Sequence, residues 1–128
     1  MMLDPVALVA GYLTSCSDVP AAAVTGDLLD RQAGQTSIYL RHSGGFRVTR
    51  HRMDRADVEY DVYHEHRSEA STLSRVCRDL LLEDLPGRVV NGALVLDVVE
   101  ISSPQYYPDP TSREHVYGGE VTIFYIES

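Results

Sequence analysis

Lysine is missing from the 128-residue sequence, so all 11 basic residues are arginines, and 19 acidic residues outnumber them. The formal net charge is −8. A protein that grips nucleic acid contacts the phosphates with clustered arginine or lysine side chains. The charge balance therefore argues against a nucleic-acid-binding protein.

The sequence has only two cysteines, Cys16 and Cys77. They lie far apart, in no spacing typical of a metal site, and each falls on the apolar side of a predicted helix. This arrangement predicts two free, buried thiols rather than a disulfide.

Signals for targeting and membrane insertion are also missing. The first residues, MMLDPVALVAGYL, contain Asp4 and no basic residue, which is unlike a signal peptide. No apolar run approaches the roughly 18 residues that a membrane span needs. We expect a soluble, cytoplasmic chain with no membrane partner.

The motifs of common enzyme sites are absent as well. There is no G-x-S-x-G sequence, no glycine-rich phosphate loop and no cysteine in an electropositive setting. We therefore expect a protein that is not an enzyme and that has no catalytic residue, no cofactor and no metal ion.

Two segments have the pattern of amphipathic helices. Asp4 followed by Pro5 predicts a helix start, and apolar residues then recur at helical spacing up to a predicted end within 15–18. The second helix is predicted to begin at Ser68 and Glu69 and to end at the sequence EDLPG. Its predicted buried stripe consists of Ala70, Leu73, Val76, Cys77, Leu80 and Leu81.

Five segments have the pattern of strands: 36–42, 46–53, 57–64, 92–102 and 119–128. Gly44 and Gly45 are predicted to form the turn between the first two strands, and segment 92–102 is apolar enough to be central in the sheet. The elements together predict one α+β domain spanning residues 1–128. Its sheet would be largely antiparallel or mixed, with about four or five strands and with two main helices packed on one face.

The second and third of these strands are expected to form a hairpin with a turn at 54–56, so that Met53 pairs with Asp57. Val48 would then face Val62, and Arg50 would face Tyr60. In this register one face carries the apolar side chains of Phe46, Val48, Val58, Tyr60 and Val62.

Segment 57–67, DVEYDVYHEHR, carries acids at alternate positions, namely Asp57, Glu59 and Asp61. Side chains at this spacing project from one face of a strand. Such a row could bind a divalent cation, but arginines of the neighbouring segment offer cross-strand partners, which favours an ordinary solvent-facing surface. His64 and His66 could also bind a metal, yet His66 is predicted to lie past the strand, so the two are not expected to converge.

Residues 103–119, SPQYYPDPTSREHVYGG, are predicted to form a long connection. Loops of this length usually have a function, and aromatic residues are enriched in protein–protein interfaces. Because two tyrosines lie between prolines here, we expect a semi-rigid interface loop. The candidate interface residues of the whole chain are Gly44, Gly45, Phe46, Tyr106, Tyr107, Pro108 and Arg113.

The order of the predicted elements and the strand–helix junction at 57–81, DVEYDVYHEHRSEASTLSRVCRDLL, resemble the tail terminator (tail-completion) proteins of long-tailed, siphovirus-type phages. In that family a segment of the type V-D-V-x-V-[YF]-A-x-[DS]-R-x-x-A leads into the main helix. The residues that fit this pattern are Val58, Asp61, Val62, Tyr63, Arg67 and Ala70.

The resemblance implies a structural virion protein that forms a homo-hexameric ring, caps the tail tube, stops its polymerisation and provides the surface that joins tail to head. The implied partners are further copies of the chain, the tail tube protein and a head–tail connector or stopper protein. Genomic DNA would pass through the lumen without specific binding, which fits an acidic chain. Asp57, Glu59 and Asp61 are then candidates for an acidic lumen or interface face, and the implied location is the head-proximal end of the tail, after assembly in the host cytoplasm.

Two other functions stay open at this point. One is a different head–tail joining protein, such as a stopper or adaptor. The other is a small metal-dependent nuclease of the Holliday-junction-resolvase type, in which Asp57, Glu59 and Asp61 would converge on magnesium. That enzyme also needs a basic surface to hold DNA, and the net charge and the missing lysines argue against one.

Overall fold

A computed structural model gives the fold and describes residues 4–28, 31–49, 53–111 and 113–127. It confirms the predicted α+β class. The elements follow one another in the order α1 (Pro5–Ser15), η1 (Ala21–Ala23), β1 (Val24–Thr25), β2 (Ser37–Thr49), β3 (Met53–His64), α2 (Arg67–Asp79), η2 (Leu80–Asp84), β4 (Val89–Val90), β5 (Ala93–Pro108) and β6 (His115–Glu127).

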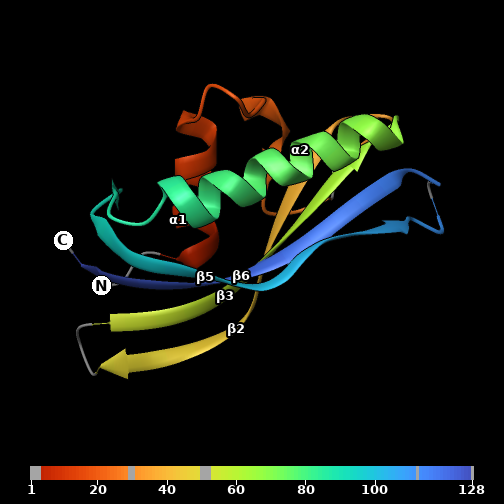
Figure 1. The fold of residues 1–128 in the computed structure, drawn as a ribbon. Coiled ribbons are helices and arrows are strands. Elements are labelled where there is room, and N and C mark those ends of the chain that lie inside the picture. Colours follow the sequence, from red (N-terminus) through yellow and green to blue (C-terminus); the bar gives the residue numbers. More distant parts are fainter. Residues whose placement is uncertain (1–3, 29–30, 50–52, 112, 128) are drawn as a thin grey trace.

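One curled sheet contains six strands in the order β1-β2-β3-β6-β5-β4. Neighbouring strands are antiparallel except for β1 and β2, which are parallel. Because β1 and β4 have only 2 residues each, four long strands make up most of the sheet. Figure 1 shows both helices on the same side of this sheet, as predicted. We call the opposite side the open face.

Both main helices begin and end close to the predicted positions. The Asp4 carboxylate accepts a hydrogen bond of 2.8 Å from the Val6 N–H. Pro5 occupies the first helical position, where its missing N–H is harmless because an N–H there has no acceptor within the helix. After its last regular turn, α2 continues as the π-helical segment η2, which carries Leu81 into the core. Both cysteines are free thiols, as predicted; Cys77 is buried, and Cys16 is half-buried.

The core fills the space between the helices and the sheet. Alternate residues of β3 point into it, whereas the acids between them do not. Complete burial contributes about 1.5–3 kcal/mol for each large apolar side chain. The largest of these fully buried side chains are Tyr60, Leu8, Leu13, Ile38, Leu40, Leu81, Leu85 and Ile123.

The predicted turn at Gly44 and Gly45 is wrong, because β2 continues through both glycines to Thr49. Gly45 has a φ of 125°, and a Cβ atom there would collide with the backbone carbonyl oxygen of Arg55 on β3. A glycine pair therefore serves a bulge and a close approach of two strands here, not a chain reversal.

The predicted hairpin register is also wrong, because β2 is one continuous strand from Ser37 to Thr49 and pairs with β3 along its length. Met53 pairs with Thr49, and Val62 and Tyr60 pair with Ile38 and Leu40 of the first half of β2. The segment 54–56, expected as a turn, lies within β3. Phe46 and Val48 consequently do not share the core face with Val58, Tyr60 and Val62, and both are exposed. Arg50 lies outside the described residues.

Two further expectations fail at the other end of the sheet. Segment 103–119 is not one long connection, because β5 extends to Pro108 and β6 begins at His115. Only residues 109–114 join the two strands. In addition, β5 is not central: β3 and β6 occupy the middle of the sheet, and only the short β4 lies outside β5.

None of the helices in the described part of the chain has the length and apolar character that a membrane crossing requires.

Candidate interaction surface

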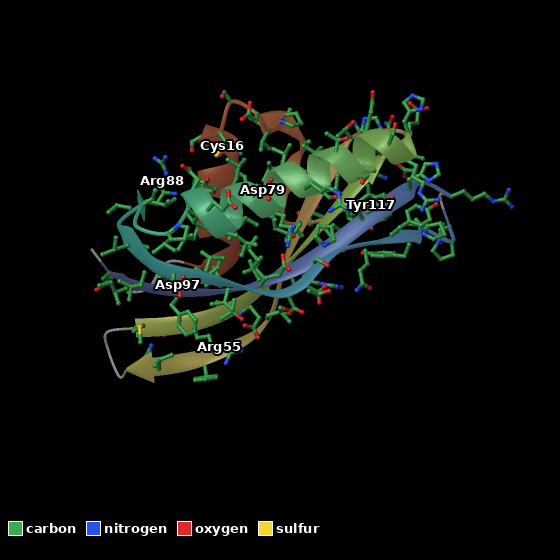
Figure 2. All side chains as sticks on the ribbon, viewed as in Figure 1. Cys16, Arg55, Asp79, Arg88, Asp97 and Tyr117 are labelled. Carbon is green, nitrogen blue, oxygen red and sulfur yellow. The ribbon has the colours of Figure 1, made fainter. Side chains whose placement is uncertain are left out.

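The open face is polar in the middle of the sheet and more apolar toward the end at which β2 and β3 are connected. Cross-strand pairing places open-face residues of the four long strands in rows. Three successive rows are Arg41, Glu59, Glu120 and Ser102; Gly44, Asp57, Thr122 and Val99; and Phe46, Arg55, Phe124 and Asp97. Figure 2 shows Arg55 and Asp97 on this side of the sheet, away from the helices.

Two of the three predicted acids are engaged with neighbours on adjacent strands. Glu59 forms an ion pair with Arg41 on β2. Asp57 accepts a hydrogen bond of 2.7 Å from the Thr122 hydroxyl on β6, and its carboxylate lies 3.5 Å from Nε of Arg55. The segments 4–28, 31–49, 53–111 and 113–127 contain no group of three or more His, Cys, Asp or Glu side chains placed to hold a metal ion.

The third acid, Asp61, is buried and lies on the opposite side of β6 from Tyr107 of β5. Its carboxylate accepts a hydrogen bond from the Tyr107 hydroxyl. This contact passes over Gly118, where a Cβ atom would lie 2.5 Å from Asp61 Oδ1 and 2.9 Å from the Tyr107 hydroxyl. Burial raises the pKa of Asp61 above the ordinary 3.8, and the weaker effect of the hydrogen bond from Tyr107 opposes that rise.

A buried ion pair fixes the connection 109–114 to the loop that precedes β2. Arg31 donates a hydrogen bond of 2.7 Å to Glu114 Oε1, and its side chain is only 10% exposed, against 5% for Glu114. The guanidinium also donates to the Ser37 hydroxyl at 2.7 Å and lies 4.5 Å from the ring centroid of Tyr63. The pKa of Arg31 is raised, chiefly by the hydrogen bond to Glu114. Sequence reasoning missed this pair.

Tyr106, predicted to be an exposed interface residue, is held on the helix side of the sheet. Its hydroxyl and His115 Nδ1 are 2.9 Å apart, and its ring centroid lies 5.3 Å from that of Tyr117. The Arg67 guanidinium at the start of α2 lies 3.9 Å from the centroid of the Tyr106 ring. Figure 2 shows Tyr117 between β6 and α2. This cluster contributes to the junction between β5, β6 and α2.

The remaining predicted interface residues fall at two opposite ends of the sheet. Gly44, Gly45 and Phe46 lie toward the connection between β2 and β3, and the Phe46 ring is exposed, with its centroid 5.2 Å from the guanidinium carbon of Arg55. Pro108 and Arg113 are exposed at the connection between β5 and β6. The structure therefore does not join the predicted interface residues into one surface.

No protein-family model and no curated protein matches the chain.

Exposed apolar side chains on the strands of the sheet are the feature most informative about function. Among the described residues, seven large apolar side chains are exposed, and six of them belong to β2 or β5. The sequence analysis predicted only Phe46 and Tyr107 as interface residues, because Val48, Leu96, Val99 and Ile101 lie in predicted strands and Val89 lies in no predicted element. The seven are Phe46, Val48, Val89, Leu96, Val99, Ile101 and Tyr107.

Proposed function

We propose that the chain is a structural subunit of the virion of a long-tailed phage, a tail terminator that assembles into a homo-hexameric ring at the head-proximal end of the tail. The ring caps the tail tube, stops its polymerisation and offers a joining surface to a head–tail connector or stopper protein. The observation that carries the proposal is the set of exposed apolar side chains on β2 and β5.

Contiguous patches of exposed apolar side chains mark sites of protein–protein contact, and the exposed residues fall into two groups, Phe46 and Val48 on β2 and Leu96, Val99 and Ile101 on β5. Here they lie on the two long strands that flank the central pair, β3 and β6. The family resemblance of the strand–helix junction 57–81 also supports the proposal, and the α+β fold with both helices on one face agrees with the expected architecture.

The mechanism is geometric. One side of the ring matches the last ring of tube subunits, and the other side offers no site to a further tube subunit, so growth stops. The net charge of −8 disfavours adhesion of DNA phosphates to the ring while the genome passes through. Asp57 and Glu59 on the open face are candidates for an acidic lumen or for a contact between subunits.

The test combines the purified chain with tail tube subunits encoded in the same genome. Negative-stain electron microscopy of the chain alone is expected to show rings with a central hole, and co-sedimentation is expected to show binding to assembled tubes. A chain that stays monomeric at every concentration and also fails to bind tube subunits would contradict the proposal.

A further inference from the structure

The sheet ends on both sides in a long strand whose outer edge is largely unpaired among the described residues. β1 pairs with only Ile38 and Tyr39 of β2, and β4 with only two residues of β5. We call residues 40–49 the β2 edge and residues 96–108 the β5 edge. Unpaired strand edges of this length are templates for pairing with another chain.

Irregularities in these two strands turn apolar side chains toward solvent. The pairing of β2 with β3 and of β5 with β6 is interrupted at five places, where a residue of β2 or β5 has no partner on the neighbouring strand. At three of these places the residue is apolar and exposed: Val48 in β2, and Leu96 and Ile101 in β5. Their exposed fractions are 44%, 45% and 46%. Proteins guard an edge with charged residues, prolines or bulges; the β5 edge contains Pro104 and Pro108, but the residues at these three irregularities are apolar and uncharged. Apolar residues at these positions favour contact with a partner.

The two edges carry opposite charges. The β2 edge contains Arg41, His42 and Arg47 and no acid, whereas the β5 edge contains Asp97 and Glu100 and no basic residue. Three of these side chains also form ion pairs within the chain: Arg41 with Glu59, Arg47 with Asp54 and Glu100 with Arg78. Pairing two β2 edges would bring arginines together, and pairing two β5 edges would bring carboxylates together; both arrangements are unfavourable. Pairing a β2 edge with a β5 edge brings opposite charges together.

Strand direction fits the same pairing. The three contacts from β2 through β3 and β6 to β5 are all antiparallel, so β2 and β5 run in opposite directions. A neighbouring copy in the same orientation therefore presents its β2 edge antiparallel to the β5 edge of the first copy, with both open faces on one side. Such a contact uses two different surfaces, and it repeats around a closed ring or along a filament.

We infer that copies of this chain associate by antiparallel pairing of the β2 edge of one copy with the β5 edge of the next. The inference rests on the proposed function for its partner, a second copy of the chain, and names the contact between subunits.

Lysine substitutions at exposed positions test this contact. Val48→Lys blocks the β2 edge and Ile101→Lys blocks the β5 edge, and both replace side chains that are already exposed. Val89→Lys is the matched control, because Val89 is 59% exposed and lies on β4, outside both edges. Far-ultraviolet circular dichroism and thermal melting establish that each variant is folded, and sedimentation velocity then gives the oligomeric state.

The wild-type chain and Val89→Lys are expected to form the same oligomer, and each edge variant alone is expected to be monomeric. A mixture of Val48→Lys and Ile101→Lys in equal amounts is expected to form dimers that do not grow, because each variant retains one intact edge and the two intact edges are complementary.

Several outcomes would overturn the inference. Dimers of Ile101→Lys alone would show pairing of two β2 edges, and dimers of Val48→Lys alone would show pairing of two β5 edges. Edge variants that assemble like the wild type, a mixture that stays monomeric, or a wild-type chain that is monomeric at about 1 mM would also overturn it.

The two proposals can fail separately. A chain that assembles through these edges but does not bind or stop tail tubes would contradict the proposed function and leave the edge contact standing. A chain that stops tube growth while both edge variants assemble normally would contradict the edge contact alone.

Discussion

Tyr60 provides a sharp test of the core as described. Its side chain is fully buried, and its hydroxyl has no hydrogen-bond partner among the described residues. The hydroxyl lies against the backbone of Gly119, where a Cβ atom would be 2.5 Å from the oxygen. Replacement of Tyr60 by phenylalanine removes this oxygen and keeps the ring.

The expected effect follows from the missing partner. A buried hydroxyl without a hydrogen bond costs about 1–3 kcal/mol, and part of this is regained when the oxygen is removed. The small gap that it leaves offsets some of the gain. We expect Tyr60→Phe to raise the free energy of unfolding by about 1 kcal/mol, or the melting temperature by about 4 °C for a domain of this size.

Tyr12 is the matched control, because it is also buried but its hydroxyl is well bonded. That hydroxyl lies 2.7 Å from Asp84 Oδ2 and 3.1 Å from the carbonyl oxygen of Leu80. Removal of a hydrogen bond to a charged group costs about 1.5–3 kcal/mol. Tyr12→Phe is therefore expected to lower the melting temperature by roughly 6–12 °C.

Urea titration and differential scanning calorimetry of the two variants measure these changes. The same chemical change is expected to have opposite signs at the two positions. A loss of stability in Tyr60→Phe as large as that in Tyr12→Phe would refute the reasoning, since the Tyr60 hydroxyl would then have a partner in solution.

Three further predictions concern the ion pair, the buried carboxyl and a glycine. Arg31→Met removes the guanidinium from the buried Glu114 carboxylate, which keeps the Gly34 N–H as a donor, and is expected to cost about 3–5 kcal/mol in urea titration. Arg88→Met, which breaks an exposed pair, is expected to leave the melting temperature nearly unchanged; equal effects would contradict this assignment. Burial raises the pKa of the Asp61 carboxyl above its ordinary value of 3.8. The folded chain therefore binds the carboxyl proton more tightly than the unfolded chain does. The resulting stabilisation is fully present when the pH is below the unfolded-state pKa, and it is lost as the pH rises through the raised pKa of the folded state. Asp61→Asn should therefore gain stability relative to the wild type as pH rises from about 4 to 7, and a constant difference would be contrary to it. Gly118→Ala is expected to destabilise by about 1–3 kcal/mol through overpacking, while Gly26→Ala, which meets its nearest atom at 3.4 Å, should change the melting temperature less; the reverse order would contradict the packing described.

The parts of the fold that could be predicted from the sequence are those set by local signals. The sequence Asp4-Pro5 caps α1, and the helical spacing of apolar residues defines the buried side of α2. Paired glycines are ambiguous at this level, because a bulge and a turn require the same freedom of the backbone. At Gly45 the nearby carbonyl of Arg55 decides between them, and that contact arises only once β2 and β3 pair.

The contacts of the candidate surface depend on residues that are distant in sequence. Arg31 and Glu114 are separated by 83 positions, and neither has a neighbouring motif that announces the pair. Tyr106 reads as an exposed loop residue until Arg67 and His115 are placed beside it. The unpaired edges likewise become visible only from the order of the strands.

The central claim is that the chain ends tail tube growth as a ring. Electron microscopy of tail tube subunits polymerising with and without the chain tests it most directly. The account predicts that tubes stop growing when the chain is added and carry a ring at one end. Tubes that continue to lengthen, with no ring at either end, would contradict it.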